Sequence, residues 1–174
     1  MYGHSLKYIL TGMSYTGNDL HTMIDYLKDE CNTQSKDLEE IEAFANDYTL
    51  NNAVLYYTKY AFLYRRLNEA LRKCDVVAMY KMGIFIRDLH HQIVNIHRNT
   101  FLDGELTLYR GILMPASLFE QKLCDKEGAL LSINEFWSTS KNDDVARIFA
   151  HESHPSQDAA VLFCINVIPS VSTM

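Results

Sequence analysis

The chain has 174 residues, a formal net charge of −6, 48% hydrophobic residues and 22% charged residues. This length and composition predict one globular domain with a real hydrophobic core. An acidic chain without a basic tail argues against non-specific nucleic-acid binding. The basic residues concentrate between residues 51 and 100, on predicted helices, where a solvated helix face is the simplest interpretation.

Cysteine spacing and the N-terminal sequence exclude further classes. Cys31, Cys74, Cys124 and Cys164 are far apart, and no Cys-x-x-Cys pair is present to predict a zinc knuckle. No secretory signal is recognisable, and the apolar runs are too short to span a bilayer. We therefore expect a cytoplasmic, thiol-reduced protein without membrane contact, with secretion and disulfide pairing left open.

The first 98 residues have the periodicity of helices. Leu20, Met23, Ile24 and Leu27 share one face of a helix that starts near Asn18 or Asp19 and ends near Cys31. Ser35 can cap a second helix, and a longer helical stretch starts near Thr49 or Asn51, with a break near Thr58. Its apolar stripe comprises Val54, Tyr57, Ala61, Tyr64, Leu67 or Asn68, and Leu71.

The next helix follows Asp75, which we expect to cap it. Its apolar residues recur at intervals of three and four, and they are Met79, Met82, Ile86, Leu89, Ile93 and Ile96. A second stripe of Val77, Tyr80 and Ile84 predicts burial on two sides. This would be the central helix of the N-terminal half.

After a turn at residues 99–104 the pattern changes to short strands. We expect strands at 106–113, near 130–138 and at 160–168, the last with a buried, inert Cys164. Pro115 suits the first turn of one helix, and Asn142 can cap another at 143–150. Helices first and strands later predict an α+β fold.

Two strand ends carry the candidate site. Tyr109-Arg110-Gly111 ends the first strand, and Phe136-Trp137-Ser138-Thr139-Ser140 ends the next. Arg supplies a planar fork of donors for phosphate, and Ser and Thr supply adjustable partners, so an anion or nucleotide pocket is plausible. The alternatives are an exposed edge-strand Arg110 and a strand end with a helix cap at Ser140 or Asn142.

These motifs resemble those of a known family. Tyr-Arg-Gly, followed about 26 residues later by Phe-Trp-Ser-Thr-Ser, is similar to the first two motifs of the arginine-specific mono-ADP-ribosyltransferases of the R-S-E class. The run from Tyr56 to His90, with Tyr64-Arg65-Arg66-Leu67-Asn68-Glu69, resembles the helical region before the Arg strand. The resemblance covers roughly residues 50 to 170.

The resemblance implies a fold, a substrate and residue roles. The fold is a helical N-terminal region followed by a mixed β-sandwich with NAD in its cleft, which divides the chain into residues 1–48 and a partial domain at 49–174 (helices 49–98, strand-rich part 105–174). Arg110 would hold the NAD phosphates, Ser138 would support the catalytic Glu, and Thr139 and Ser140 would support the cleft strand. Phe136 or Trp137 would form a pocket wall, and Gly111 would allow close ligand approach. The implied partners are NAD, with NADP left open, and a protein acceptor bearing arginine.

The family's third motif, Glu-x-Glu, is missing at its place. The reaction needs one carboxylate for an oxocarbenium-like ribose and a second for the acceptor guanidinium. No Glu follows Glu152, the only later acid is Asp158, and Glu40-Ile41-Glu42 precedes the Arg motif on a predicted solvated helix face. We therefore expect a fragment, truncated isoform or partial gene product with missing C-terminal strands, weak NAD binding and little or no transferase activity.

Two other readings stay open. In the first, the chain is a non-catalytic pseudoenzyme or protein-interaction module with the same fold. In the second, it is a helical scaffold in which the Arg and Ser motifs occur by coincidence. Packing of Arg110 away from Ser138 would favour the coincidence. The pairs His90 and His97, and His151 and His154, do not match a closed metal site, so we expect no metal.

Overall fold

The structure is a computed structural model that describes residues 8–31, 35–100, 103–131, 133–151 and 158–168. The chain divides into two compact units. The helical unit comprises Met1–Thr100 and Asn134–Phe136, and the strand unit comprises Phe101–Ile133 and Trp137–Met174. The predicted α+β class is confirmed, because helices and an antiparallel sheet are both present. The predicted division after residue 48 falls inside the helical unit and stays a prediction.

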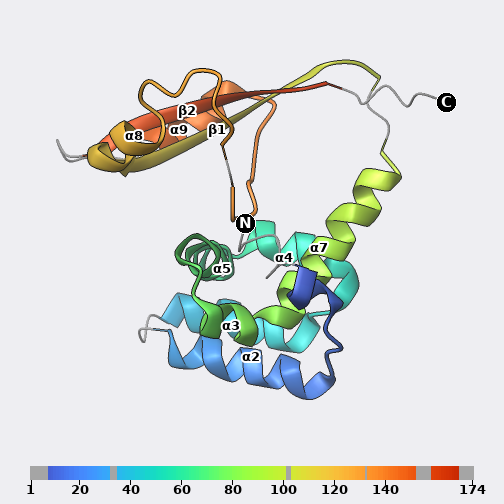
Figure 1. Cartoon of the computed structure of the whole chain (residues 1–174). Coiled ribbons are helices and arrows are strands. Elements are labelled where there is room, and N and C mark those ends of the chain that lie inside the picture. The colour runs from blue at the N-terminus through green and yellow to red at the C-terminus, as the bar shows by residue number, and fades with distance from the viewer. Residues whose placement is uncertain (1–7, 32–34, 101–102, 132, 152–157, 169–174) are drawn as a thin grey trace. The chain divides into compact units, whose positions relative to one another are not determined.

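The helical unit consists of short helices that pack side by side (Figure 1). After a helical turn at residues 8–12, its elements are α2 (Gly17–Asp29), α3 (Ser35–Asp47), the 3-10 turn η1 (Leu50–Asn52), α4 (Ala53–Lys59), α5 (Ala61–Lys73), α6 (Val76–Lys81) and α7 (Gly83–Arg98). The first two predicted helices are confirmed. The predicted break near Thr58 lies two residues later, at Tyr60, which has an extended backbone.

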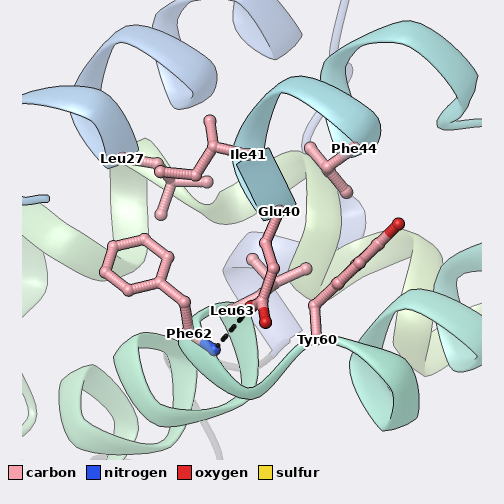
Figure 2. Close-up of a pocket in the computed structure, with 7 residues that line it drawn as sticks. All are labelled: Leu27, Glu40, Ile41, Phe44, Tyr60, Phe62 and Leu63. Carbon is pink, nitrogen blue, oxygen red and sulfur yellow. Dashed lines mark hydrogen bonds between the residues drawn. The ribbon is translucent and has the colours of Figure 1, made fainter. Parts of the chain in front are cut away.

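Side chains at the helix termini explain where several of these helices start. Asp75 accepts a 3.0 Å hydrogen bond from the backbone N–H of Ala78, which confirms it as the cap of α6. The start of α5 is capped from another helix, because the carboxylate of Glu40 in α3 accepts a 3.1 Å bond from the N–H of Phe62 (Figure 2). Glu40 is therefore half-buried, and the predicted solvated face is wrong for Glu40, whereas Glu42 is exposed. Ile41 is buried, as its place on the apolar stripe of this helix predicts.

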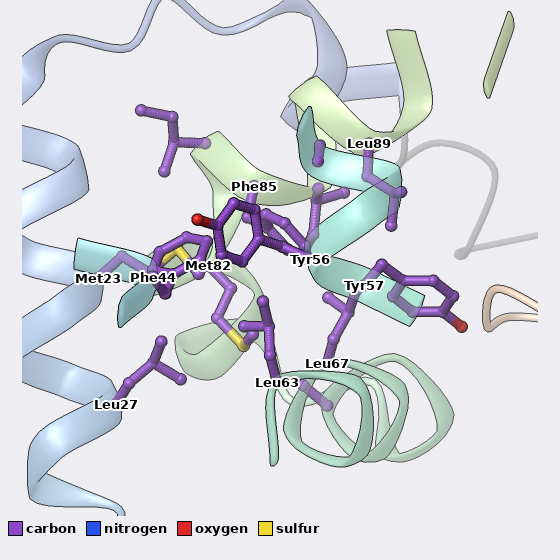
Figure 3. Packing of buried hydrophobic residues seen from close by; sticks show 14 of the residues in the cluster. Met23, Leu27, Phe44, Tyr56, Tyr57, Leu63, Leu67, Met82, Phe85 and Leu89 are labelled. Atoms are coloured by element: carbon purple, nitrogen blue, oxygen red, sulfur yellow. The ribbon is translucent and has the colours of Figure 1, made fainter. Parts of the chain in front are cut away.

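The core of the helical unit is built from apolar and aromatic side chains of several helices (Figure 3). The ring of Phe44 meets those of Tyr56 and Phe85 edge to face, with centroids 5.3 and 5.8 Å apart. Aromatic pairs in this geometry stabilise the fold beyond the free energy that burial of their apolar surface contributes. A cavity of about 10 Å³ remains beside Glu40 and Phe44 (Figure 2), about the room that one water needs.

The predicted central helix is two helices. The chain turns at Met82, and a side chain at Gly83 would collide with the Tyr15 hydroxyl, 2.4 Å from an ideal Cβ. The first stripe is buried from Met79 to Leu89, but Ile93 and Ile96 are exposed. The second stripe is wrong at Val77 and Tyr80, which are also exposed, because α6 is short and only one of its faces meets the core.

The strand unit contains β1 (Leu106–Pro115), α8 (Ala116–Lys122), α9 (Asp143–His151) and β2 (Asp158–Val167). β1 and β2 pair side by side (Figure 1). The pair is antiparallel, and its register runs from Leu106 opposite Val167 to Pro115 opposite Asp158. Both strands were predicted, but the strand expected near 130–138 is absent from the described residues of that segment. Its residues 134–136 belong to the helical unit instead.

Candidate functional site

Arg110 lies at the middle of β1, opposite Phe163 of β2, and only 8% of it is exposed. Its Nη1 donates a 2.9 Å hydrogen bond to the carbonyl oxygen of Ser138. Its guanidinium carbon lies 5.2 Å from the ring centre of Trp137, a favourable neighbour for a cation. A buried guanidinium keeps its charge and needs acceptors. The alternative of an exposed edge-strand Arg is therefore wrong.

The second motif runs directly beside the first. Tyr109 and Ser140 exchange two backbone hydrogen bonds of 2.8 and 2.9 Å. Because Tyr109 also lies opposite Cys164 in the sheet register, β1 is placed between β2 and residue 140. Arg110 and Ser138 are thus in contact, which removes the observation that would have favoured a coincidence of motifs.

The three hydroxyl residues differ in their surroundings. Ser138 and Thr139 are exposed, whereas Ser140 is half-buried. The Oγ of Ser140 accepts a 3.0 Å bond from the N–H of Asn142, and the Oδ1 of Asn142 accepts a 2.9 Å bond from the N–H of Asp144. The predicted cap of α9 at Asn142 is therefore confirmed. Ser140 holds the turn before the helix, as the alternative interpretation expected.

Gly111 has a structural reason to be glycine. An ideal Cβ at this position would lie 1.7 Å from the carbonyl oxygen of Ala146 and 3.0 Å from the nitrogen of Ala150. Ala146 and Ala150 are buried residues of α9. The space beside Gly111 is thus filled by the backbone of α9, where we had expected the approach of a ligand.

Phe136 and Trp137 are neighbours in sequence but belong to different units. The Phe136 ring lies 5.9 Å from the Tyr57 ring and packs against the core of the helical unit. The Trp137 ring lies 4.8 Å from the Phe163 ring and faces Arg110 within the strand unit. Of the two predicted wall residues, Trp137 is the one that the structure brings to Arg110.

Two described acids that follow Ser138 have neighbours other than Arg110. The Asp143 carboxylate accepts a 3.0 Å bond from Nε of Arg147 on the same helix. Asp158 lies opposite Pro115, five residues along β1 from Arg110 and therefore roughly 17 Å away. Glu152 and His154 lie outside the described residues.

Two further expectations concern metals and thiols. The described part of the chain holds no group of three or more His, Cys, Asp or Glu side chains that could bind a metal ion. All four cysteines are free, and Cys164 is exposed. The prediction of a buried Cys164 is wrong because alternate residues of β2 remain exposed in this two-stranded sheet.

A polar residue on an apolar helix stripe is a sequence signal of buried polar contacts. Asn68 falls on the apolar stripe of α5 and is 2% exposed. A buried amide needs partners, and Asn68 has them in Tyr57 and Phe136, at 2.9 and 3.2 Å. An amide on an apolar stripe could therefore have predicted a contact with a distant segment.

Comparison of the chain with models of protein families, with curated proteins and with solved structures finds no match. Among the described residues, no helix has the length and apolar character that crossing a membrane requires.

Proposed function

We propose that the chain binds NAD through Arg110 as part of an arginine-directed, R-S-E class mono-ADP-ribosyltransferase domain. In this function ADP-ribose passes from NAD to a protein side chain and nicotinamide is released. One observation carries the proposal. The Arg and Ser motifs, 28 residues apart, meet in a 2.9 Å hydrogen bond between Arg110 and the Ser138 carbonyl.

The chemistry of this cluster suits a dinucleotide. The guanidinium supplies the positive charge and fork of donors that a pyrophosphate accepts. The neighbouring Trp137 ring provides an aromatic surface, and the exposed Ser138 and Thr139 provide hydroxyls beside it. The further β-strands of a sandwich fold are part of this proposal, as is the role of Ser138 in supporting a catalytic carboxylate.

NAD binding and ADP-ribose transfer need different residues. The 174 residues contain no Glu-x-Glu after Ser138, so this polypeptide lacks the two carboxylates that the resemblance assigns to ribose and acceptor. We therefore propose NAD binding with weak or absent transferase activity for this chain.

Calorimetric titration of NAD tests the proposal, with Arg110→Ala as the site variant. Arg147→Ala is the matched control because it removes the same charge from an exposed residue of the same unit. We expect wild type and Arg147→Ala to bind alike and Arg110→Ala to bind at least about tenfold more weakly. Arg110→Lys, which keeps the charge without the fork, should also weaken binding.

A folded wild-type chain that does not bind NAD would contradict the proposal, and so would equal binding by wild type and Arg110→Ala. Circular dichroism of every variant separates loss of binding from loss of fold, which is needed because Arg110 is buried.

A second candidate is a non-catalytic interaction module. The observation that favours it is that Arg110 already bonds to Ser138 and faces Trp137 within the protein, so its burial has a structural explanation. Retained stability of the wild type without any NAD binding is the result that this candidate predicts.

A further inference from the structure

A second site lies in the helical unit and does not depend on NAD. Asn134, Glu135 and Phe136 belong to this unit by their contacts, although the residues on both sides of them belong to the strand unit. They form neither helix nor strand. The side chains that hold them come from α4, α5 and the residue after α5, and we call Tyr57, Asn68, Arg72 and Cys74 the tripeptide site.

The tripeptide site binds the backbone of one residue at both of its polar groups. Oδ1 of Asn68 accepts a 3.2 Å hydrogen bond from the N–H of Phe136, and the Tyr57 hydroxyl donates a 2.8 Å bond to its carbonyl oxygen. Nδ2 of Asn68 donates a 2.9 Å bond to the same hydroxyl, which fixes both groups relative to each other. These bonds recognise a backbone whatever its side chain.

The neighbouring contacts select side chains. Nη1 of Arg72 lies 2.9 Å from the carboxylate of Glu135, and the Phe136 ring meets the Tyr57 ring edge to face. Nδ2 of Asn134 lies 4.0 Å from Sγ of Cys74. The site therefore suits an acidic residue followed by an aromatic residue.

The polar groups of the tripeptide site are buried while residues 134–136 occupy it. Asn68 is 2% exposed and Tyr57 is 5% exposed. Without a bound backbone, Oδ1 of Asn68 would lose the N–H donor that it has in the structure, and a buried acceptor without a donor is costly. Release of the bound backbone therefore requires another hydrogen-bond partner for Oδ1 of Asn68.

We propose that the tripeptide site is a peptide-docking site, held by the chain's own residues 134–136 in the free protein. It also takes a segment of a partner protein in which an acidic residue precedes an aromatic one. The partner's segment replaces the internal segment by making the same backbone bonds and the same pair with Arg72. Intramolecular competition sets the affinity, because the internal segment is present at high effective concentration.

The test uses full-length chains and a fluorescein-labelled peptide with the sequence of residues 131–139. Glu135→Ala combined with Phe136→Pro removes the charge and the N–H through which the internal segment binds. By fluorescence anisotropy, we expect this double variant to bind the peptide at least about tenfold more tightly than wild type does. Glu135→Arg, which keeps the backbone and repels Arg72, is the second host and should also bind more tightly than wild type.

A matched peptide isolates the backbone contact. In it the phenylalanine is N-methylated, so the ring and the acidic neighbour remain while the N–H that Asn68 accepts is lost. We expect the double variant to bind this peptide at least about tenfold more weakly than the parent peptide. A peptide with alanine in place of the glutamate should lose less, because the Arg72 pair is exposed on one side.

The proposal is overturned if both folded variant chains fail to bind the parent peptide, or if parent and N-methylated peptides bind equally. It is also overturned if light scattering shows that the wild-type chain dimerises and that Glu135→Arg abolishes the dimer. That result would assign the tripeptide site to a second copy of this chain.

Discussion

The backbone carbonyl oxygen of Ala146 lies only 1.7 Å from the position that a Cβ atom on Gly111 would occupy. Gly111 therefore lets α9 lie directly against β1, one residue after Arg110. The contact places the backbone of α9 against the middle of the strand. The integrity of the strand unit should depend on this glycine more than on other glycines in the same unit.

Gly111→Ala should destabilise the strand unit by about 2 kcal/mol or more, because neither backbone can move away without distorting its element. The single tryptophan of the chain, Trp137, lies in this unit and reports its unfolding. Urea denaturation followed by tryptophan fluorescence gives the change in free energy of unfolding. Gly104→Ala is the control, since a Cβ there meets nothing within 4 Å. Equal stability of both variants would contradict the packing described.

Tyr48 should make the helical unit sensitive to alkali. Its hydroxyl donates a 2.9 Å bond to the buried carboxylate of Asp88. Burial, and then the negative charge of Asp88, raise the pKa of Tyr48 well above its ordinary value. The folded protein thus holds a proton that the unfolded chain releases above about pH 10, so this contribution to stability is complete below pH 10 and falls as the pH rises further.

Thermal unfolding at pH 7 to 11 measures this effect. The midpoint of wild type should fall above pH 10, and that of Tyr48→Phe should fall less steeply, although the raised pKa values of Tyr15, Tyr26 and Tyr56 leave a residual slope. Tyr80→Phe, at an exposed tyrosine, should follow wild type. Identical slopes for wild type and Tyr48→Phe would show that this hydroxyl does not couple folding to pH.

Asp19 should make the start of α2 sensitive to acid. Its carboxylate accepts bonds of 2.7 and 2.8 Å from the backbone N–H and the hydroxyl of Thr16, and these bonds lower the pKa of Asp19. A lowered folded pKa gives stability that is complete above the unfolded value of about 4 and is lost as the pH falls through the folded pKa.

Asp19→Asn should therefore lower the melting temperature at pH 7, and the difference from wild type should shrink towards pH 2. Circular dichroism at 222 nm follows both proteins. Asp25→Asn, on an exposed position of the same helix, should leave the melting temperature nearly unchanged at pH 7. A difference between wild type and Asp19→Asn that is constant with pH would rule out the capping carboxylate as its source.

Local sequence patterns predicted the elements that depend on residues close together in the sequence. Asp75 and Asn142 are predictable as caps because a short polar side chain before a helix can accept a hydrogen bond from a backbone N–H of its first turn. The β-branched run in β2 was recognised for the same kind of reason. The predictions at Val77, Tyr80, Ile93 and Ile96 failed because the apolar period does not tell which of its positions another element covers.

The candidate site was predicted as residue types and not as an arrangement. The sequence indicated Arg110 and Ser138 together. It did not show that Arg110 would donate a hydrogen bond to the backbone carbonyl of Ser138. Nor did it show that Ser138 and Thr139 would remain exposed. It also gave Phe136 and Trp137 one shared role, although their contacts assign them to different units.

The sequence by itself determined the α+β class, most helix starts, both described strands and the polar residues that the Arg and Ser motifs contain. These follow from the backbone preferences and hydrogen bonds of residues a few positions apart. Only the tertiary structure decided that α9 occupies the space at Gly111, that Arg110 is buried against Trp137, and that Asn68 holds Phe136. Such contacts join residues 27 to 68 positions apart. Their free energy depends on which surfaces the folded chain brings together, and no local pattern contains that information.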